Sequence, residues 1–495
     1  MGFVFYVFFY CVAFRYIDNN QDKLISRLAD AVTHQSVGGS PHLREECHKI
    51  VHWTEKVLIL LSFFFIAFKN FKILQDLGAK TELVEHPNNV ELDYPPVLLA
   101  SIVTSIEKPT ICVFGHLDVQ SALRQNENWE TDPFVLTEMD GYLYGRGSTD
   151  DKGPCCAWLN CIEAYQNTKH QLPCNVKFVF DCMEGSDNLE KAIEQRKDFF
   201  ENVSFVCISD NHWLTADKPS ITYGLRGACY FSVTVECSKR DLHSGIYGGA
   251  VHEAMWDLMA ILDSLVSSNG QIQIPGINEM VAPLNKEEEQ LYENINFDVE
   301  KYWKDETGAP CLLNNLQNDK IKLLMNRWRF PSLTIHGIEG AFSDSGAKTV
   351  IPRKVTGKFS IRLVPNQTPE EVEKCVKDHV ESVFKARHSP NQLTFGKVIC
   401  GVAPWVADVK HPSIEAAKMA TKRVWGVDPD LTREGGSMPA ALTFESMTNV
   451  KAMLLPIGQS TDGAHSNRER MSKTNYLNGS KLFAAFLEEF SHISD

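Results

Sequence analysis

Side chains that could hold a metal ion follow short apolar segments at distant points of the chain. Four of these segments are TICVFGHLD, GRGSTDD, VKFVFDCME and SFVCISD, and a fifth, DGAHS, lies near the carboxyl end. Imidazole and carboxylate groups that meet at one site are typical ligands of zinc and manganese. Their number and type indicate a metal site, and two ions are expected. The residues that could meet there are His116, Asp118, Asp150, Glu184, Asp210 and His465.

The elements of an open α/β sheet can bring such segments together, because the carboxyl ends of its strands converge on one crevice. Up to about Tyr223 the chain alternates strand-like and helix-like segments, which predicts a parallel sheet with helices on both faces. Taken alone, each polar residue could be a turn residue or a helix cap. Their joint occurrence at successive strand ends favours a common site. The clearest segments are strands at 97–103, 110–114 and 450–456 and helices at 19–50, 154–166 and 413–424.

A second pattern begins near Gly227, where residues 230–236 and 358–364 alternate apolar and polar side chains. Such alternation is typical of antiparallel strands with one exposed face. The predicted fold class is therefore α/β, with a mixed, mainly parallel sheet flanked by helices and an inserted α+β domain. We expect residues 15–225 and 400–495 to form the first domain and residues 226–399 to form the inserted one.

The composition excludes some classes of partner. The 495 residues include 49 basic and 63 acidic side chains, a formal charge of −14, which argues against a nucleic-acid surface. The 14 cysteines are scattered, apart from the neighbours Cys155 and Cys156, and form no CxxC pair. This distribution favours a reducing, cytoplasmic compartment.

Two apolar segments differ from the rest of the chain. Residues 1–14 lack the basic residues and cleavage site of a secretory signal. Residues 57–70 separate two parts of one helical face, so we interpret them as an insertion that interrupts a helix. An artefact of how the coding sequence was assembled is one origin for such an insertion. Because a membrane helix needs about 20 apolar residues, we expect neither segment to span a membrane.

Several longer strings resemble the dinuclear metallopeptidases of the M20 family, and in particular its dipeptidases. They include GHLDVQ, LYGRGSTDDKGP, CISDN, ITYGLRG, DLHSGIYGG, LTREGGS and DGAHS, and the resemblance extends from about Tyr16 to Phe490. It implies a catalytic domain that holds two divalent metal ions per subunit, zinc or manganese. It also implies that the inserted domain is a lid through which the subunits form a homodimer, and that small dipeptides are the substrates.

The resemblance also implies a role for each residue of the metal site. His116, Asp150 and Asp210 would bind one ion, and Asp150 would bridge to a second ion bound by His465. Asp118 would orient the His116 ring as an outer carboxylate. Glu184 would be the general base that takes a proton from the attacking water.

Four further residues resemble the substrate-binding residues of the family. Arg362 would anchor the carboxylate of a dipeptide, and Ser437 would add a hydroxyl donor. His243 and Thr349 would reach the active site of the partner subunit, where His243 could stabilise the oxyanion. Without the resemblance, Arg362 would be interpreted as a surface ion-pair residue and His243 as a turn residue.

The chain departs from the family after Glu184. The family has Met-Glu-Glu-Ser-Gly-Ser, in which the second glutamate binds a metal, whereas here Met183 and Glu184 are followed directly by Gly185. Glu184 could keep one role while Asp187 or water partly fills the other, with weak binding of the second ion. Alternatively, the two-residue gap is a sequence error, or activity is reduced or lost.

The sequence thus predicts a cytoplasmic, homodimeric, metal-dependent dipeptidase with no nucleic-acid or membrane partner. An aminoacylase or carboxypeptidase-type amidohydrolase of the same family would share the metals and Arg362. A non-catalytic or weakly active relative would keep the fold and the dimer without efficient turnover. Metal stoichiometry distinguishes an enzyme with two ions from a relative with one or none.

Overall fold

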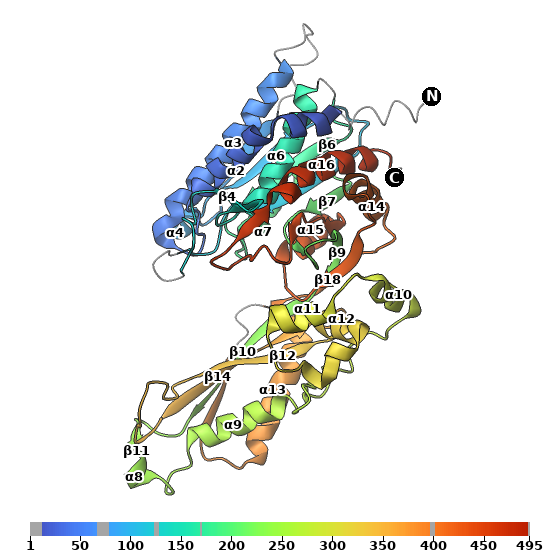
Figure 1. The fold of residues 1–495 in the computed structure, drawn as a ribbon. Coiled ribbons are helices and arrows are strands. Elements are labelled where there is room, and N and C mark those ends of the chain that lie inside the picture. Colours follow the sequence, from blue (N-terminus) through green and yellow to red (C-terminus); the bar gives the residue numbers. More distant parts are fainter. Residues whose placement is uncertain (1–11, 67–78, 123–127, 169–170, 397–400, 494–495) are drawn as a thin grey trace. The chain divides into compact units, whose positions relative to one another are not determined.

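The computed structural model describes residues 12–66, 79–122, 128–168, 171–396 and 401–493 (Figure 1). It divides into two compact units. The first comprises residues up to 223, 407–432 and 443–495, and the second comprises 224–406 and 433–442. Residues 1–11 and 67–70, part of the two unusual apolar segments, lie outside the described residues.

A nine-stranded sheet, which lies in the first unit except for β17 and the ends of β9 and β18, has the order β1-β2-β6-β3-β7-β19-β9-β17, and β18 pairs with β9. At its centre β6, β3, β7 and β19 are parallel, while the outer pairs are antiparallel, so the predicted mixed sheet is confirmed. The central strands are apolar runs that are buried on both faces. The strands are β1 (Lys80–Val84), β2 (Val97–Ile102), β3 (Thr110–His116), β6 (Asn175–Asp181), β7 (Phe205–Ile208), β9 (Ser220–Leu225), β17 (Trp405–Val406), β18 (Asp430–Glu434) and β19 (Ala452–Leu454).

Helices pack on this sheet and supply much of its core. Figure 1 shows α6 beside α2 and α16, and nearly every residue of α6 is buried. The Trp158 ring of α6 stacks on Phe483 of α16 with 4.1 Å between ring centroids. The principal helices of this unit are α2 (Gln21–Thr33), α3 (Arg44–Ile66), α6 (Lys152–Asn167), α7 (Asn188–Gln195), α14 (Pro412–Trp425), α15 (Pro439–Thr448) and α16 (Lys473–Phe490), of which α15 begins in residues of the second unit.

Helix α3 corrects the prediction that the segment from Val57 interrupts a helix. The helix runs unbroken from Arg44 to Ile66, and Leu58 and Leu61 are buried while Leu60 is 63% exposed. Leucine and isoleucine are good or adequate helix formers, so this apolar run prolongs the helix. No described helix is both long and apolar enough to cross a membrane.

The second unit contains a separate antiparallel sheet with the order β12-β14-β10-β15, with β16 also paired to β10. Alternate residues of β10 are buried, and the apolar face of the sheet packs against α9 and α13 (Figure 1). This is the predicted α+β domain. Its main elements are β10 (Gly227–Glu236), α9 (Ala254–Leu265), α10 (Lys286–Asn294), α12 (Lys320–Trp328), β12 (Ser332–Glu339), β14 (Lys354–Leu363), α13 (Pro369–Ala386), β15 (Gln392–Gly396) and β16 (Gly401–Val402).

Shorter elements complete both units. The small sheets are β21-β5-β4 and β20-β8 in the first unit and β11-β13 in the second. Their bounds, with the short helices, are α4 (Asn89–Leu92), β4 (Thr137–Met139), β5 (Tyr142–Tyr144), β8 (His212–Trp213), β11 (Leu242–His243), α8 (Ser244–Tyr247), α11 (Val299–Lys301), β13 (Val350–Ile351), β20 (Gly458–Gln459) and β21 (Arg470–Ser472).

The unit boundary differs from the expected one near the carboxyl end. Residues 401–406 and 433–442 belong to the second unit, although the sequence placed them in the first domain. The reason is contact between segments that are distant in sequence: β16 pairs with β10, and Ser437 accepts a hydrogen bond from Arg362 of β14. Such long-range pairing leaves no signal in the order of the residues.

Candidate metal centre

Three adjacent parallel strands of the first unit end at the predicted metal site. His116 is the last residue of β3 and lies in register with Asp181, the last residue of β6. Asp210 follows the end of β7, which pairs with the other side of β3. The parallel centre of the sheet therefore places these polar residues along one edge, as predicted.

Asp150 lies between the two histidines of the site. Its Oδ1 is 3.0 Å from His116 Nε2, and its Oδ2 is 2.9 Å from His465 Nε2. The two oxygens of one carboxylate thus face two different imidazoles. Asp150 therefore connects the two histidines of the cluster.

Glu184 and Asp210 complete the cluster around His116. Asp210 Oδ2 is 3.7 Å and Glu184 Oε2 is 3.8 Å from His116 Nε2. Ligand atoms of these three residues lie within 4.8 Å of one another, close enough to bind a single ion. His465 is more exposed than the others, at 61% of its side chain, so one side of the cluster is open.

Asp118 holds the His116 ring in a defined orientation. The ring Nδ1 is 3.0 Å from the Asp118 carbonyl oxygen and 3.5 Å from its Oδ1. Both neighbours are acceptors, which favours a proton on Nδ1, and in that tautomer Nε2 is the nitrogen that could bind a metal. The Asp118 carboxylate also accepts from the backbone N–H of Glu184, at 3.2 and 3.3 Å, and so connects two residues of the cluster.

The cluster carries more negative than positive charge in a buried place. Burial, with the Asp150 carboxylate next in importance, raises the pKa of Asp210 well above its usual value. For Glu184 the His116 ring lowers the pKa, but burial, Asp118 and Asp150 together raise it. Burial disfavours the protonated imidazolium form of His116, but the surrounding carboxylates raise the pKa of the ring well above its ordinary value. A divalent cation would relieve this repulsion.

Sequence reasoning missed Glu469, a fully buried residue that shapes the loop containing Asp150. Its Oε1 accepts backbone N–H groups from Gly147, Thr149 and Asp150 at 3.0 to 3.2 Å, and Arg146 donates to its Oε2 at 2.8 Å. Burial raises the pKa of Glu469, and the nearby Asp150 adds to this. The segment SNRERMS around it contains no motif that would have revealed this role.

Asp462 and Asp181 were also missed. Asp462 accepts from the Thr149 hydroxyl at 3.1 Å and from the Gln459 N–H at 2.9 Å, and burial raises its pKa to about 7. Asp181 Oδ1 accepts the N–H of Cys182 and Met183 directly before Glu184, and burial raises its pKa to about 6. The only available signal was their closeness in sequence to His465 and Glu184.

The donor set agrees with a divalent metal centre. Two imidazole nitrogens and several carboxylate oxygens are suitable for zinc or manganese. Asp187, a possible substitute for the absent glutamate, lies elsewhere: its Oδ1 is 3.3 Å from His86 Nε2. Among the described residues, the site therefore has no carboxylate from the Gly185–Asp187 turn.

The predicted substrate-binding residues lie in the second unit and form two groups. Arg362 Nη1 donates to Ser437 Oγ at 3.0 Å. His243 and Thr349 are both exposed and adjacent, because β11 pairs with β13 and the Ser244 N–H donates to the Thr349 carbonyl. His243 Nδ1 accepts the Gly245 N–H at 3.1 Å, which leaves Nε2 as a donor.

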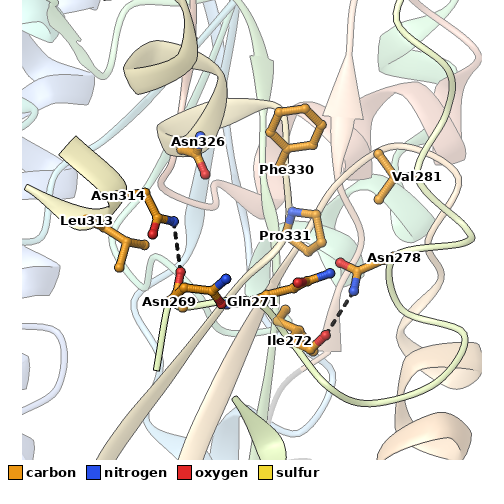
Figure 2. A pocket seen from close by; sticks show the side chains of 11 residues that line it. Asn269, Gln271, Ile272, Asn278, Val281, Leu313, Asn314, Asn326, Phe330 and Pro331 are labelled. Carbon is orange, nitrogen blue, oxygen red and sulfur yellow. Dashed lines mark hydrogen bonds between the residues drawn. The ribbon is translucent and has the colours of Figure 1, made fainter. Parts of the chain in front are cut away.

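Figure 2 shows a pocket of about 450 Å³ in the second unit. Its wall includes the carboxamides of Asn269, Gln271 and Asn278 beside apolar Phe330 and Pro331. Among the residues that the structure describes, no carboxylate, imidazole or thiol lines it. This pocket therefore lacks the groups needed to bind a metal or to transfer protons.

Comparison with known proteins agrees with this geometry. The model of Peptidase family M20/M25/M40 matches residues 112–489. The Beta-Ala-His dipeptidase of Rattus norvegicus is 44% identical over 490 residues, which cover 97% of this chain and 95% of that protein. The Cys-Gly metallodipeptidase DUG1 of Saccharomyces cerevisiae is 43% identical over 483 residues, which cover 97% of each protein.

A solved structure is also similar. The crystal structure of human carnosine dipeptidase 1 superimposes with a TM-score of 0.83 at 42% identity and covers 97% of this chain and 98% of that one. The family match spans most of the sequence and includes the strands that carry the cluster. The chain belongs to the M20 family of metallopeptidases and is a homologue of its dipeptidases.

Proposed function

We propose that the chain is a metal-dependent dipeptidase that hydrolyses the peptide bond of small dipeptides. The position of Asp150 between His116 and His465, with Glu184 beside them, is the observation that carries this proposal. Names of the relatives support the substrate class, because one is described as acting on Beta-Ala-His and another on Cys-Gly.

His116, Asp150 and Asp210 would hold one divalent ion, zinc or manganese, and Asp150 and His465 would hold a second. Divalent ions at such a centre polarise a carbonyl group and lower the pKa of water. Asp118 keeps the His116 Nε2 lone pair directed at the centre. Glu469 and Asp462 act behind the ligands by holding the loop that presents Asp150.

Glu184 would be the proton carrier. Its carboxylate is close to His116 and Asp210, and burial with the neighbouring carboxylates raises its pKa, which favours uptake of a proton. It would accept a proton from the water that attacks the peptide carbonyl and then deliver that proton to the departing amine. Cleavage yields two amino acids without a covalent intermediate.

Arg362 and Ser437 would bind the free carboxylate of the dipeptide. A guanidinium can donate two parallel hydrogen bonds to a carboxylate, and the Ser437 hydroxyl lies next to it. His243 Nε2, as a free donor, would stabilise the oxyanion, and Thr349 would contribute beside it.

A homodimer would bring these groups together. In one chain β14 separates Thr349 from Arg362, and its eight residue steps from Lys354 to Arg362 span roughly 26 Å. A dipeptide is far shorter, so we propose that His243 and Thr349 serve the partner subunit. The exposed edge strand β12 and the exposed Trp256 and Met259 of α9 are suitable interface elements.

The missing second glutamate favours a second candidate, a weakly active or non-catalytic relative. With Asp187 directed at His86, the second ion would depend on His465, Asp150 and water. We therefore propose that this ion binds weakly and that turnover requires added metal. We also propose a cytoplasmic location, which the free thiols of the described cysteines support.

Hydrolysis of a panel of dipeptides and N-acetyl amino acids with added zinc or manganese tests the proposal. Preferential cleavage of dipeptides, abolished by Glu184→Gln, is the expected result. Preferential cleavage of the N-acetyl compounds would instead support an aminoacylase. If neither class is cleaved at saturating metal, the active-enzyme proposal is wrong for this sequence.

A further inference from the structure

The second unit contains arginines of two kinds. Arg329 and Arg433 share the carboxylate of Glu288, at 2.7 and 2.8 Å. Arg226 and Arg362 form no ion pair with a carboxylate among the residues described. Partly buried cations without a counter-charge are uncommon unless an anion binds to them.

Arg226 binds three groups in two separate segments with its guanidinium. It donates from Nε to the Gly435 carbonyl at 3.2 Å, and from Nη1 to Ser332 Oγ at 3.0 Å and the Phe330 carbonyl at 3.4 Å. It thereby connects the loop after β18 with the segment that leads into β12.

Both neighbours of the Arg362 side chain are bonded to Arg226, Ser332 through the guanidinium and Ser437 through the main-chain carbonyl. Ser332 is the cross-strand partner of Arg362 in the β12–β14 pair and accepts from Arg226. Ser437 accepts from Arg362 and donates to the Arg226 carbonyl at 2.6 Å. A substitution that removes the Arg226 guanidinium would therefore release Ser332 and the Gly435 carbonyl of the Ser437 loop, whereas the bond from Ser437 to the main-chain carbonyl would remain.

The positive charges of Arg226 and Arg362 lie close enough to repel each other. Burial, followed by repulsion from Arg362, lowers the pKa of Arg226 to about 10, and Glu434 only partly offsets this. Neighbouring guanidiniums repel each other in a partly buried place, and a bound carboxylate would relieve that repulsion.

We propose that Arg226 is a positioning residue of the substrate-carboxylate site, whose guanidinium holds Ser332 and the Gly435 carbonyl of the Ser437 loop around Arg362 and makes binding depend on a free carboxylate. This inference rests on the proposed function, because it takes Arg362 as the anchor of the dipeptide. It goes beyond that function by assigning a second arginine that does not itself need to touch the substrate.

Binding and turnover of L-alanyl-L-alanine test the inference separately. Calorimetric titration uses the metal-loaded Glu184→Gln protein, which does not consume the ligand, with and without Arg226→Met. We expect Arg226→Met to raise Kd about tenfold or more. In protein with Glu184 intact, KM should rise similarly while kcat stays within about twofold. Arg226→Lys, which keeps the charge but not the planar fork, should recover part of the loss.

Two controls distinguish positioning from general damage. L-alanyl-L-alaninamide lacks the carboxylate, so Arg226→Met should not change its weaker binding. Arg353 is a half-exposed arginine of the same unit, and Arg353→Met should leave the binding of both ligands unchanged. Unchanged Kd in Arg226→Met, or an equal loss for the amide, would overturn the inference.

The same titrations separate this inference from the proposed function. If the chain binds the dipeptide with the expected dependence on Arg226 but never cleaves it, the proposed dipeptidase activity is contradicted and the proposed carboxylate-binding site is supported. A chain that cleaves dipeptides with unchanged KM after Arg226→Met would contradict the positioning role alone.

Discussion

Glu469 shows how one buried carboxylate can shape a candidate metal centre through its hydrogen bonds to the backbone. It accepts hydrogen bonds from three backbone N–H groups of the Gly147–Asp150 loop and from Arg146. Asp150 is part of this loop, and the loop conformation positions its carboxylate between His116 and His465. The role of Glu469 is therefore to keep the Asp150 carboxylate in position between the two imidazoles.

Replacing Glu469 with glutamine tests that role. The amide nitrogen would face Arg146 or the backbone N–H groups, and the loop would lose part of its support. We expect zinc affinity to fall by about 10- to 100-fold, measured with a competing chelator. Glu130→Gln, a change at an exposed glutamate, is the matched control. Affinities within twofold of each other in the two variants would contradict the role.

The absent glutamate gives a second prediction at this scale. Inserting Glu-Ser between Glu184 and Gly185 restores the order found in the family. We expect the insertion to tighten binding of the second ion and to raise turnover at low metal, measured by metal analysis after dialysis and by dipeptide hydrolysis. Insertion of Gln-Ser provides the control, because it restores the length without the carboxylate. Equal behaviour of the two insertions would show that the charge is not what the site lacks.

The sequence predicted the residues of the cluster, because strand ends with His, Asp or Glu are visible as local patterns. It did not predict Glu469, Asp462 or Asp181, since their function depends on partners that only the fold brings near. Asp187 illustrates the same limit: its place in the sequence suggested the metal site, but its carboxylate pairs with His86.

Helix α9 depends on one buried charge for its place in the second unit. Asp257 is completely buried and accepts from Arg387 at 2.7 Å, Ser389 at 2.5 Å and Asn391 at 2.8 Å, and lies 3.0 Å from His252. Burial opposes the charge, but these hydrogen bonds lower the pKa of Asp257 below its ordinary value. The ionised form is therefore the one that stabilises the fold.

Asp257→Asn should reduce the free energy of unfolding by about 2–3 kcal/mol at neutral pH, measured by urea titration. Because the folded-state pKa is lowered, the stabilisation is present above the unfolded value of about 4 and is lost as the pH falls through the folded value. The difference between variant and parent should shrink in acid. A difference that stays constant from pH 7 to pH 3 would contradict this account. Asp263→Asn on the same helix serves as the control.

For individual helices and strands, the periodicity of apolar residues predicted the structure correctly wherever the pattern was regular. The buried strands β3 and β6, the half-exposed strands β10 and β14 and the helix α6 follow from local patterns. The break predicted at Val57 was wrong, because an apolar run is compatible with helix continuation. The assignment of 433–442 to the second unit required contacts between distant segments and could not be predicted locally.

For the whole molecule, the separation of Arg362 from Thr349 along β14 predicts subunit complementation. A His243→Ala chain and a Glu184→Gln chain should each be inactive or strongly impaired. Mixed during refolding, they should form heterodimers in which one site has all its groups. Random pairing predicts recovery of about a quarter of the parental activity. No recovery from a mixture shown to contain heterodimers would contradict action across the interface.

The central claim is that this cluster is a working metallopeptidase centre that depends on Glu184. The most direct measurement is steady-state hydrolysis of L-alanyl-L-alanine with saturating manganese or zinc, for the parent and Glu184→Gln, with metal content measured on the same samples. We predict turnover in the parent and a loss of about 100-fold or more in the variant, with retained metal. A parent that binds metal but does not cleave the dipeptide, or a variant as active as the parent, would contradict the claim.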